Sequence, residues 1–209
     1  MLYQSQKRIL DILGSIFGII LFSPLMLFFS ICIFLVSPGP VLADIPHRVG
    51  KNRKPFRMYK FRSMILNAHQ YLLDHPDFYE EYKKNDYKVV NDPRWLPGAS
   101  LMRKYSLDEL PQFFNVLKGE MSLVGPRAYY PFELKDQQKV YPESKPYVEK
   151  LLTTKPGLTG PWQVGGRSEL NFVDRVKLDA SYADNDSILY DLKIIARTPL
   201  AMLSGKGAV

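Results

Sequence analysis

The sequence has few residues that could build a disulfide framework or a transition-metal site. Among its 209 residues there are one cysteine and three histidines. Cys32 lies within an apolar run, and His47, His69 and His75 do not have the spacing of metal ligands. This scarcity excludes a disulfide scaffold and a zinc cluster as organising elements, so any metal should be a hard cation held by oxygen atoms.

Charge is missing from one long segment near the N-terminus. The 25 residues from Ile12 to Val36 include no charged side chain. A helix rising ~1.5 Å per residue over that length would cross a ~30 Å hydrocarbon core, so the run predicts a membrane helix. The run is too long for a cleavable signal peptide, and no small-residue cleavage motif follows it.

Acidic residues are missing from residues 45–73, where cations interleave with aromatic side chains. The cations are Arg48, Lys51, Arg53, Lys54, Arg57, Lys60 and Arg62. With a net charge of +7, the chain favours anionic partners. Next to a membrane segment, this stretch predicts contact with anionic lipid headgroups rather than nucleic acid, and a solvated basic loop is the alternative.

A serine–proline pair, Ser23-Pro24, interrupts the apolar run near its middle. A proline inside a helix removes one backbone donor and clashes with the carbonyl four residues earlier, so it predicts a kink or a break. Basic residues flank both ends of the run, and the positive-inside rule then favours neither end outside. A re-entrant hairpin on the cytoplasmic face satisfies both flanks, and a kinked spanning helix is the alternative.

The pattern along the chain predicts a mainly α fold with a little β (α+β). Helices are expected over residues 9–36, 65–82, 106–118, 131–152, 170–182 and 187–203. A short strand is expected over residues 122–124, and an irregular Gly/Pro-rich loop over residues 156–167. Prolines predict breaks or bends at four positions: Pro76, Pro142, Pro146 and Pro199. The last helix carries an apolar stripe that fits either a core or a membrane interface.

The most informative motif is residues 106–112, Ser-Leu-Asp-Glu-Leu-Pro-Gln, with adjacent carboxylates at Asp108 and Glu109. Ser106 and Glu109 fit a capping box, which predicts the start of a helix. Negative charge is favoured at a helix N-terminus, so Asp108 is expected to stay ionised, as a nucleophile or metal ligand must. Pro111 predicts a bend or a delayed start. Two first-turn acids that only suit the helix dipole are the alternative.

Four further strings accompany this dyad: Tyr59–Met64, Arg103-Lys104, Gly119–Arg127 and Lys155–Arg167. Together with the dyad they resemble the bacterial sugar transferases, the monotopic phosphoglycosyl transferases, from about residue 7 to about residue 198. The motifs are long and occur in the family's order. One position departs from the pattern, because Ala128 replaces the second proline of the family's Gly-Pro-Arg-Pro, although Arg127 is kept.

The resemblance implies both a fold and an activity. It implies a re-entrant membrane hairpin over residues 1–40 and a catalytic domain over residues 41–209, with interfacial amphipathic helices. The domain would lie on the cytoplasmic face of the bacterial inner membrane. The implied activity moves a sugar-1-phosphate from a nucleoside diphosphate sugar, expected to be a UDP-hexose, to polyprenyl (undecaprenyl) phosphate. This step would initiate capsule, exopolysaccharide or O-antigen synthesis, and a homo-oligomer is compatible with it.

Chemistry and resemblance assign roles to the same residues. Adjacent carboxylates on a helix point about 100° apart, so they cannot face each other across a sugar. Cleaving a diphosphate requires a nucleophile and cations, so Asp108 is expected to form a covalent phosphosugar intermediate and, with Glu109, to bind Mg²⁺ or Mn²⁺. Arginines clamp phosphate oxygens, and the candidates are Arg103, Arg127 and Arg167. The resemblance adds substrate-binding roles for Lys60, Arg62, Gln163 and Asp179.

Two other functions fit part of the pattern. A sugar-nucleotide or lipid-diphosphate hydrolase would use the same dyad with water as the acceptor. A basic, non-catalytic, membrane-anchored assembly module would not need the Asp108 carboxylate. The chain also fits the catalytic end of a longer protein, and the sequence does not identify the sugar.

Overall fold

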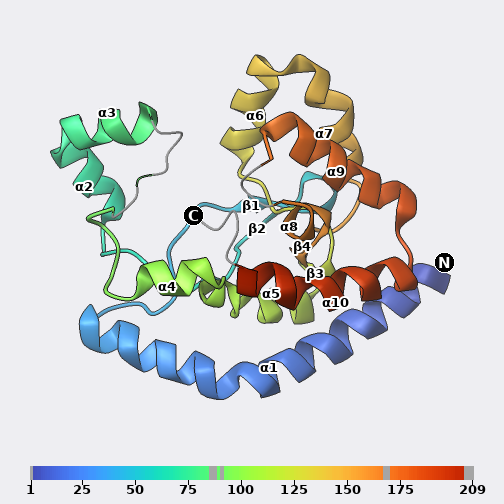
Figure 1. Cartoon of the computed structure of the whole chain (residues 1–209), viewed down its shortest axis with the longest axis horizontal. Coiled ribbons are helices and arrows are strands. Elements are labelled where there is room, and N and C mark those ends of the chain that lie inside the picture. Colours follow the sequence, from blue (N-terminus) through green and yellow to red (C-terminus); the bar gives the residue numbers. More distant parts are fainter. Residues whose placement is uncertain (1, 85–88, 90–91, 167–169, 205–209) are drawn as a thin grey trace.

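The computed structural model describes residues 2–84, 89, 92–166 and 170–204, and helices dominate this part of the chain. In chain order the elements are α1 (Leu2–Val36), β1 (Arg48–Val49), η1 (Lys51–Arg53), β2 (Pro55–Phe56), α2 (Ala68–Asp74), α3 (Pro76–Lys84), α4 (Ala99–Lys104), η2 (Leu107–Glu109), α5 (Gln112–Lys118), β3 (Ser122–Val124), α6 (Pro131–Val140), η3 (Pro142–Ser144), α7 (Lys145–Leu151), β4 (Gly157–Thr159), α8 (Pro161–Val164), α9 (Phe172–Asn185) and α10 (Ile188–Ser204). The described strands have two or three residues each, so the prediction of a mainly α fold with a little β is confirmed. Figure 1 shows α1 along one side of the molecule, next to α5 and α10.

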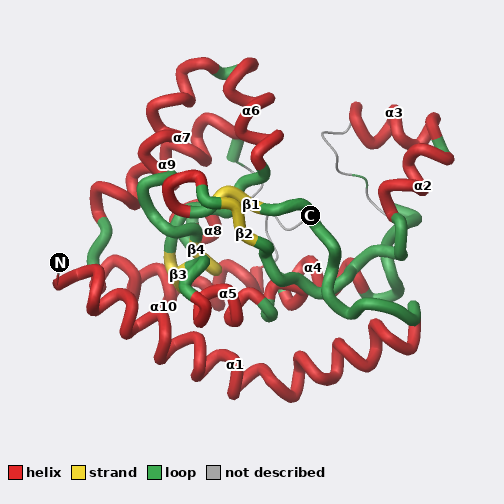
Figure 2. The backbone as a smooth tube through the Cα atoms, turned by 180° about the vertical axis from the view of Figure 1, so that it is seen from behind, coloured by secondary structure: helices red, strands yellow, loops and turns green. Residues whose placement is uncertain are grey.

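The N-terminal helix α1 continues through Pro24 rather than splitting into two helices. Pro24 has no amide to donate to the Ile20 carbonyl, and the Ser23 hydroxyl donates to that carbonyl instead, at 2.9 Å. Figures 1 and 2 show the helix bent, with its concave side toward the rest of the molecule. Of the two outcomes predicted for Pro24, the structure shows the kink within one helix and not the break.

Most of α1 turns its apolar side chains away from the protein. Its most apolar 18-residue window is 6% buried, and Phe17, Ile20 and Leu35 are 66%, 68% and 73% exposed. Among the described residues, α1 is the one helix long and apolar enough to cross a membrane. These properties are compatible with a membrane anchor, because lipid would remove this apolar surface from water.

The inner face of α1 is narrow and docks closely on the globular part. A Cβ atom at Gly14 would lie 2.5 Å from the Leu123 side chain, and one at Gly18 would lie 2.5 Å from the Phe113 ring. Asp11 is buried on the same face, and its Oδ1 accepts hydrogen bonds from the Ser122 hydroxyl and the Leu123 amide, at 2.8 and 2.9 Å. The helix is thus fixed to β3 by close backbone approach and a charge-assisted hydrogen-bond pair.

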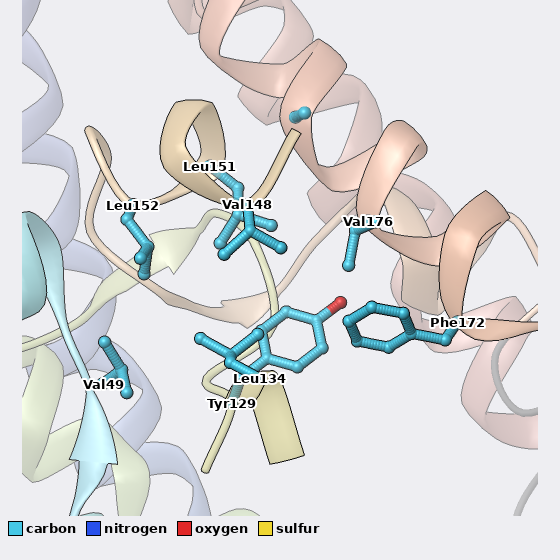
Figure 3. Close-up of a cluster of buried hydrophobic side chains, with 9 residues drawn as sticks. Val49, Tyr129, Leu134, Val148, Leu151, Leu152, Phe172 and Val176 are labelled. Carbon is cyan, nitrogen blue, oxygen red and sulfur yellow. The ribbon is translucent and has the colours of Figure 1, made fainter. Parts of the chain in front are cut away.

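The globular part has a hydrophobic core where α6, α7 and α9 meet, shown in Figure 3. Val148 and Val176 are fully buried in it. The sequence predicted an exposed helix over residues 131–152, and most of these residues are exposed, although one side of α7 is buried against α9. The break at Pro142 is confirmed by η3, whereas Pro146 lies in the first turn of α7, where the fixed φ of proline suits a helix start.

A parallel pair of strands, β3 and β4, joins two segments that lie far apart in the sequence. Residues 122–124 pair with residues 157–159. Composition predicted irregular structure over residues 156–167, but this segment contains β4 and the short helix α8. Glycine permits the close packing here, because a Cβ atom at Gly160 would lie 1.9 Å from the Gly125 carbonyl oxygen. The irregular-loop prediction was therefore wrong.

The last helix, α10, has one buried and one exposed side. Asp191 and Ile194 are buried. The exposed leucines are Leu189, Leu192, Leu200 and Leu203. The sequence predicted a helix over residues 187–203 with a bend or an end near Pro199; the helix does not end there but continues to Ser204. Figure 2 shows α10 beside α1, so its exposed leucines lie on a helix next to the long apolar helix.

Candidate active site

The dyad lies on the short 3-10 turn η2, between α4 and α5, rather than on one continuous helix. Ser106 has a left-handed backbone (φ 53°) and its side chain makes no capping hydrogen bond, so the predicted capping box was wrong. Pro111 is the N-cap of α5, and the helix ends at Gly119 as predicted. The proline ring therefore delays the start of the helix and leaves Asp108 on the turn that precedes it.

The two carboxylates of the dyad have different surroundings. Asp108 is 1% exposed, whereas the Glu109 side chain is 29% exposed. The Lys60 ammonium lies 2.8 Å from Asp108 Oδ2 and 3.5 Å from Glu109 Oε1. The Phe61 amide donates to the Asp108 carbonyl at 2.8 Å, which holds the Lys60 segment beside the dyad. The structure thus brings one lysine against both acids.

The charge on Asp108 depends on Lys60. Burial raises the pKa of the Asp108 carboxyl, and the Lys60 ammonium opposes this rise. Burial alone would lower the pKa of Lys60, but the charges of Asp108 and Glu109 outweigh burial and raise it. The sequence attributed an ionised Asp108 to a helix N-terminus. That reason is corrected, because the stabilising charge is a neighbouring ammonium group.

Arg103 belongs to the same electrostatic environment. It stands in the last turn of α4, and its guanidinium lies 5.4 Å from the Trp95 ring centroid. After the larger effects of burial, Lys60 and Glu109, its positive charge also lowers the pKa of Asp108. The charge of Arg103 therefore acts on Asp108, and its phosphate-binding role stays a prediction.

Arg127 is held by a buried network that includes Asp179. Asp179 Oδ2 accepts hydrogen bonds from the Arg127 amide and the Tyr129 hydroxyl, at 2.9 and 3.1 Å. The Arg127 guanidinium lies 4.9 Å from the Trp162 ring centroid. Burial alone would lower the pKa of Arg127, but acidic neighbours raise it, Glu133 the most, with Glu109 among the others. Asp179 is fully buried, so it acts here by fixing the turn that carries Arg127.

Ala128 stands where the family pattern has a second proline, and a side-chain contact holds the backbone at this position instead. The Arg48 guanidinium donates to the Ala128 carbonyl at 3.0 Å and lies over the Tyr130 ring at 3.2 Å. The Arg48 side chain is itself buried. A long-range side-chain contact therefore fixes the turn that a second proline would have made rigid.

Two other residues predicted to bind substrate, Arg62 and Gln163, contact groups outside the dyad. The Arg62 guanidinium donates from Nε to the Pro40 carbonyl at 2.7 Å and from Nη1 to the Ser37 hydroxyl at 2.8 Å. It thus holds the chain that leaves α1 and is not directed at the dyad. Gln163 donates to the Leu158 carbonyl at 3.0 Å. Arg167 lies outside the described residues.

Sequence reasoning missed Asn115, which positions the lysine segment. Asn115 is fully buried in α5, and its Oδ1 accepts from the Tyr59 amide at 2.8 Å. Its Nδ2 donates to the Arg57 carbonyl at 2.8 Å. These bonds align residues 57–59 beside α5 and so place Lys60. The available signal was one amide side chain within the apolar run of residues 113–117, since a buried polar group needs partners.

The dyad suits a hard divalent cation. Asp108 Oδ2 is buried and accepts no hydrogen bond of good geometry within the described residues, although Lys60 contacts it. Glu109 is partly exposed beside it. No cluster of three or more histidine, cysteine, aspartate or glutamate side chains is found in the described part of the chain. Mg²⁺ needs only one or two carboxylates when water and substrate phosphates complete its shell, so the residues fit it.

We expect stability to fall with rising pH because of Asp179. Burial raises the pKa of Asp179 to about 7. An acid with a raised pKa binds its proton more tightly in the folded chain. The free energy of unfolding should therefore fall between about pH 4 and pH 7, by up to ~1.4 kcal/mol per pH unit. Asp179→Asn should flatten this slope in urea unfolding measured from pH 5 to 8.

The exposed Asp184 provides a matched control for this experiment. Asp184→Asn should leave the wild-type slope unchanged. If Asp179→Asn also keeps the full slope, another group is responsible for it.

Comparison with known proteins gives several matches. The family model described as "Bacterial sugar transferase" matches residues 2–205. A Haemophilus influenzae protein named "Uncharacterized sugar transferase" is 41% identical, over 97% of this chain and 42% of the relative. The undecaprenyl-phosphate galactose phosphotransferase of Salmonella typhimurium is 40% identical, over 97% of this chain and 41% of the relative. The exopolysaccharide production protein ExoY of Rhizobium meliloti is 35% identical, over 97% of this chain and 87% of the relative. The chain therefore spans about two fifths of the first two relatives and most of the third.

Proposed function

Since this chain belongs to the bacterial sugar transferase family, we propose that it transfers a sugar-1-phosphate from a nucleoside diphosphate sugar to polyprenyl phosphate. The name of the Salmonella relative supports undecaprenyl phosphate as the acceptor. The name of the Rhizobium relative supports a role in exopolysaccharide production. A UDP-hexose is the donor that we propose to test first.

The observation that carries this proposal is the pair of a buried Asp108 carboxylate and a partly exposed Lys60 ammonium, which lies directly before α5, the helix that packs on α1. Phe113, five residues after Asp108, packs against the backbone of α1 at Gly18. With α1 in the membrane, the dyad would lie near the depth of lipid phosphates. A soluble donor and a lipid acceptor could then reach one carboxylate in turn.

In the first step Asp108 attacks the donor. A carboxylate oxygen forms a bond to the phosphorus that bears the sugar, and the phosphoanhydride bond to the nucleoside monophosphate breaks. The nucleoside monophosphate leaves with the electron pair, and the sugar phosphate stays on Asp108. In the second step an oxygen of polyprenyl phosphate attacks the same phosphorus and releases the Asp108 carboxylate. One anhydride is broken and another is formed, so the reaction needs no ATP.

Fixed positive groups around the dyad support both steps. Lys60 would favour the ionised form of Asp108 for the attack, against the burial that raises the pKa of this carboxyl. Arg103 and Arg127 would balance charge that develops on the phosphate oxygens. Glu109, with Asp108, would hold Mg²⁺, which supplies charge neutralisation to the diphosphate when bound. Asp179 has a positioning role through the Arg127 backbone.

The product distinguishes this function from hydrolysis. Membranes containing the chain are incubated with donors labelled in the sugar and the β-phosphate, with and without polyprenyl phosphate. Transfer predicts label in the organic phase only when polyprenyl phosphate is present. Label released to water as sugar phosphate, at a rate independent of the acceptor, would instead identify a hydrolase. Absence of turnover with all donors tested would favour the assembly module.

We further propose that α1 enters and leaves the membrane on the cytoplasmic side. The bend at Pro24 and the basic residues on both flanks support this topology. In intact cells, a cysteine introduced at position 4 in a Cys32→Ser background should resist a membrane-impermeant reagent. Pro24→Ala restores a helix donor and removes a clash, so part of the population should then span the membrane and become labelled.

The topology measurement has a clear opposing outcome. Efficient labelling at position 4 with Pro24 intact would show a spanning helix. A second cysteine placed at position 209 should stay unlabelled in both forms, which controls for cell lysis.

A further inference from the structure

A polar cavity lies where the first turns of α1 meet η1, the loop after α7 and the end of α9. Its volume is about 230 Å³. The ionisable side chains that line it, apart from Tyr182, are Lys7, Arg8, Asp11, Lys51, Lys155 and Asp186. Four of these groups are cations and two are carboxylates, so the cavity carries an excess of positive charge. Asp108, Glu109, Arg103 and Arg127 are not among the described residues that line it.

Three of these charged side chains already form hydrogen bonds within the protein. Lys7 donates to Asp191 Oδ2 at 2.7 Å and to the Val124 carbonyl at 3.0 Å. Arg8 donates to the carbonyls of Val116 and Leu117 at the end of α5, at 2.8 and 2.7 Å. The Asp11 carboxylate is held by β3, as described above. These three groups build the wall of the cavity and fix its shape.

Two lysines remain without such partners. Within the described residues, neither Lys51 nor Lys155 has a side-chain ion pair or hydrogen bond. A Cβ atom at Gly119 would lie 3.5 Å from both Arg8 Cζ and Lys155 Nζ, so these two cations lie within about 7 Å of each other. Burial lowers the pKa of Lys155, and the Arg8 charge lowers it further. The protein therefore concentrates cations here without an internal counter-ion for each.

We infer that this cavity binds a phosphate group, and that the headgroup of an anionic phospholipid supplies it. A tetrahedral anion between Lys51, Lys155 and Arg8 would offset their mutual repulsion. The cavity also lies at the depth where headgroups occur, because Lys7 and Arg8 stand just before the apolar segment of α1. This placement rests on the proposed membrane attachment of α1 and is independent of the transfer reaction.

Thermal unfolding of the full chain in detergent micelles tests this site. Phosphatidylglycerol at about 100 times its dissociation constant should raise the wild-type Tm by roughly 5 °C, whereas phosphatidylcholine should not. The double variant Lys51→Gln/Lys155→Gln should lose this rise. The matched control Lys135→Gln/Lys145→Gln makes the same change in charge on exposed positions of α6 and α7, and it should keep the rise.

Each other outcome has a defined meaning. An undiminished rise in the Lys51/Lys155 double variant, or an equal rise with phosphatidylcholine, overturns the proposed cavity site. A rise with inorganic phosphate but none with phosphatidylglycerol overturns the lipid as the source and keeps the phosphate site. The double variant should fold at least as well as wild type without lipid, since it removes repulsion between cations. Because Tm does not depend on turnover, failure here would leave the proposed function unaffected.

Discussion

Replacing Asp108 with asparagine should lower phosphosugar transfer by roughly 10³-fold or more, because the amide cannot form the covalent intermediate. Asparagine has nearly the same shape, and Lys60 keeps Glu109 as an acidic neighbour at 3.5 Å. The variant should therefore fold and associate with membranes as wild type does. Transfer is measured as labelled lipid product per amount of membrane-bound protein.

Mass spectrometry gives this prediction a second readout. Wild type incubated with donor alone should carry a phosphosugar on the peptide that contains Asp108, and Asp108→Asn should carry none. Asp136→Asn changes an exposed carboxylate on α6 and should keep both activity and adduct. An active Asp108→Asn variant, or an adduct on another residue, would contradict the assigned nucleophile.

Removing divalent cations should lower turnover by about 100-fold or more, since Mg²⁺ would no longer neutralise the diphosphate. EDTA should abolish transfer, and added Mg²⁺ or Mn²⁺ should restore it. Glu109→Gln should raise the Mg²⁺ concentration needed for half-maximal activity by roughly tenfold, because one ligand charge is lost. The measurement is the initial rate of lipid labelling across a Mg²⁺ titration.

EDTA saturated beforehand with Mg²⁺ controls for effects of the chelator on the membrane. Undiminished turnover in excess EDTA would show that protein cations are sufficient. Lys60, Arg103 and Arg127 would then supply all of the compensating charge.

Several features of the site were predictable because they depend on local sequence. Asp108 and Glu109 are adjacent in the chain, so any fold must place them together. Gly119 ends α5 as predicted, because a left-handed residue after a helix favours glycine. The proline pattern also predicted the separation of α2 from α3 and of α6 from α7. Local backbone chemistry is sufficient for statements of this kind.

Other local predictions failed where the tertiary structure favoured another conformation or another partner. Ser106 fits a capping box by spacing, but the turn before α5 adopts another backbone conformation. Residues 156–167 looked irregular by composition, yet β3 supplies a hydrogen-bonding partner for β4. Arg62 stands in a motif with Lys60, but its side chain binds the chain after α1. Sequence spacing gives no direction for a side chain whose partner lies more than twenty residues away.

The sequence by itself determined the apolar N-terminal helix, the excess of positive charge and the pair of carboxylates, since composition and spacing are sufficient for each. Only the tertiary structure decided that Lys60 compensates Asp108, that Asn115 places Lys60 and that Asp179 fixes the Arg127 turn. Those contacts join residues 48, 56 and 52 positions apart along the chain. The free energy that each contact contributes depends on burial. Burial arises only when the whole chain has packed and water has been removed from the carboxylates.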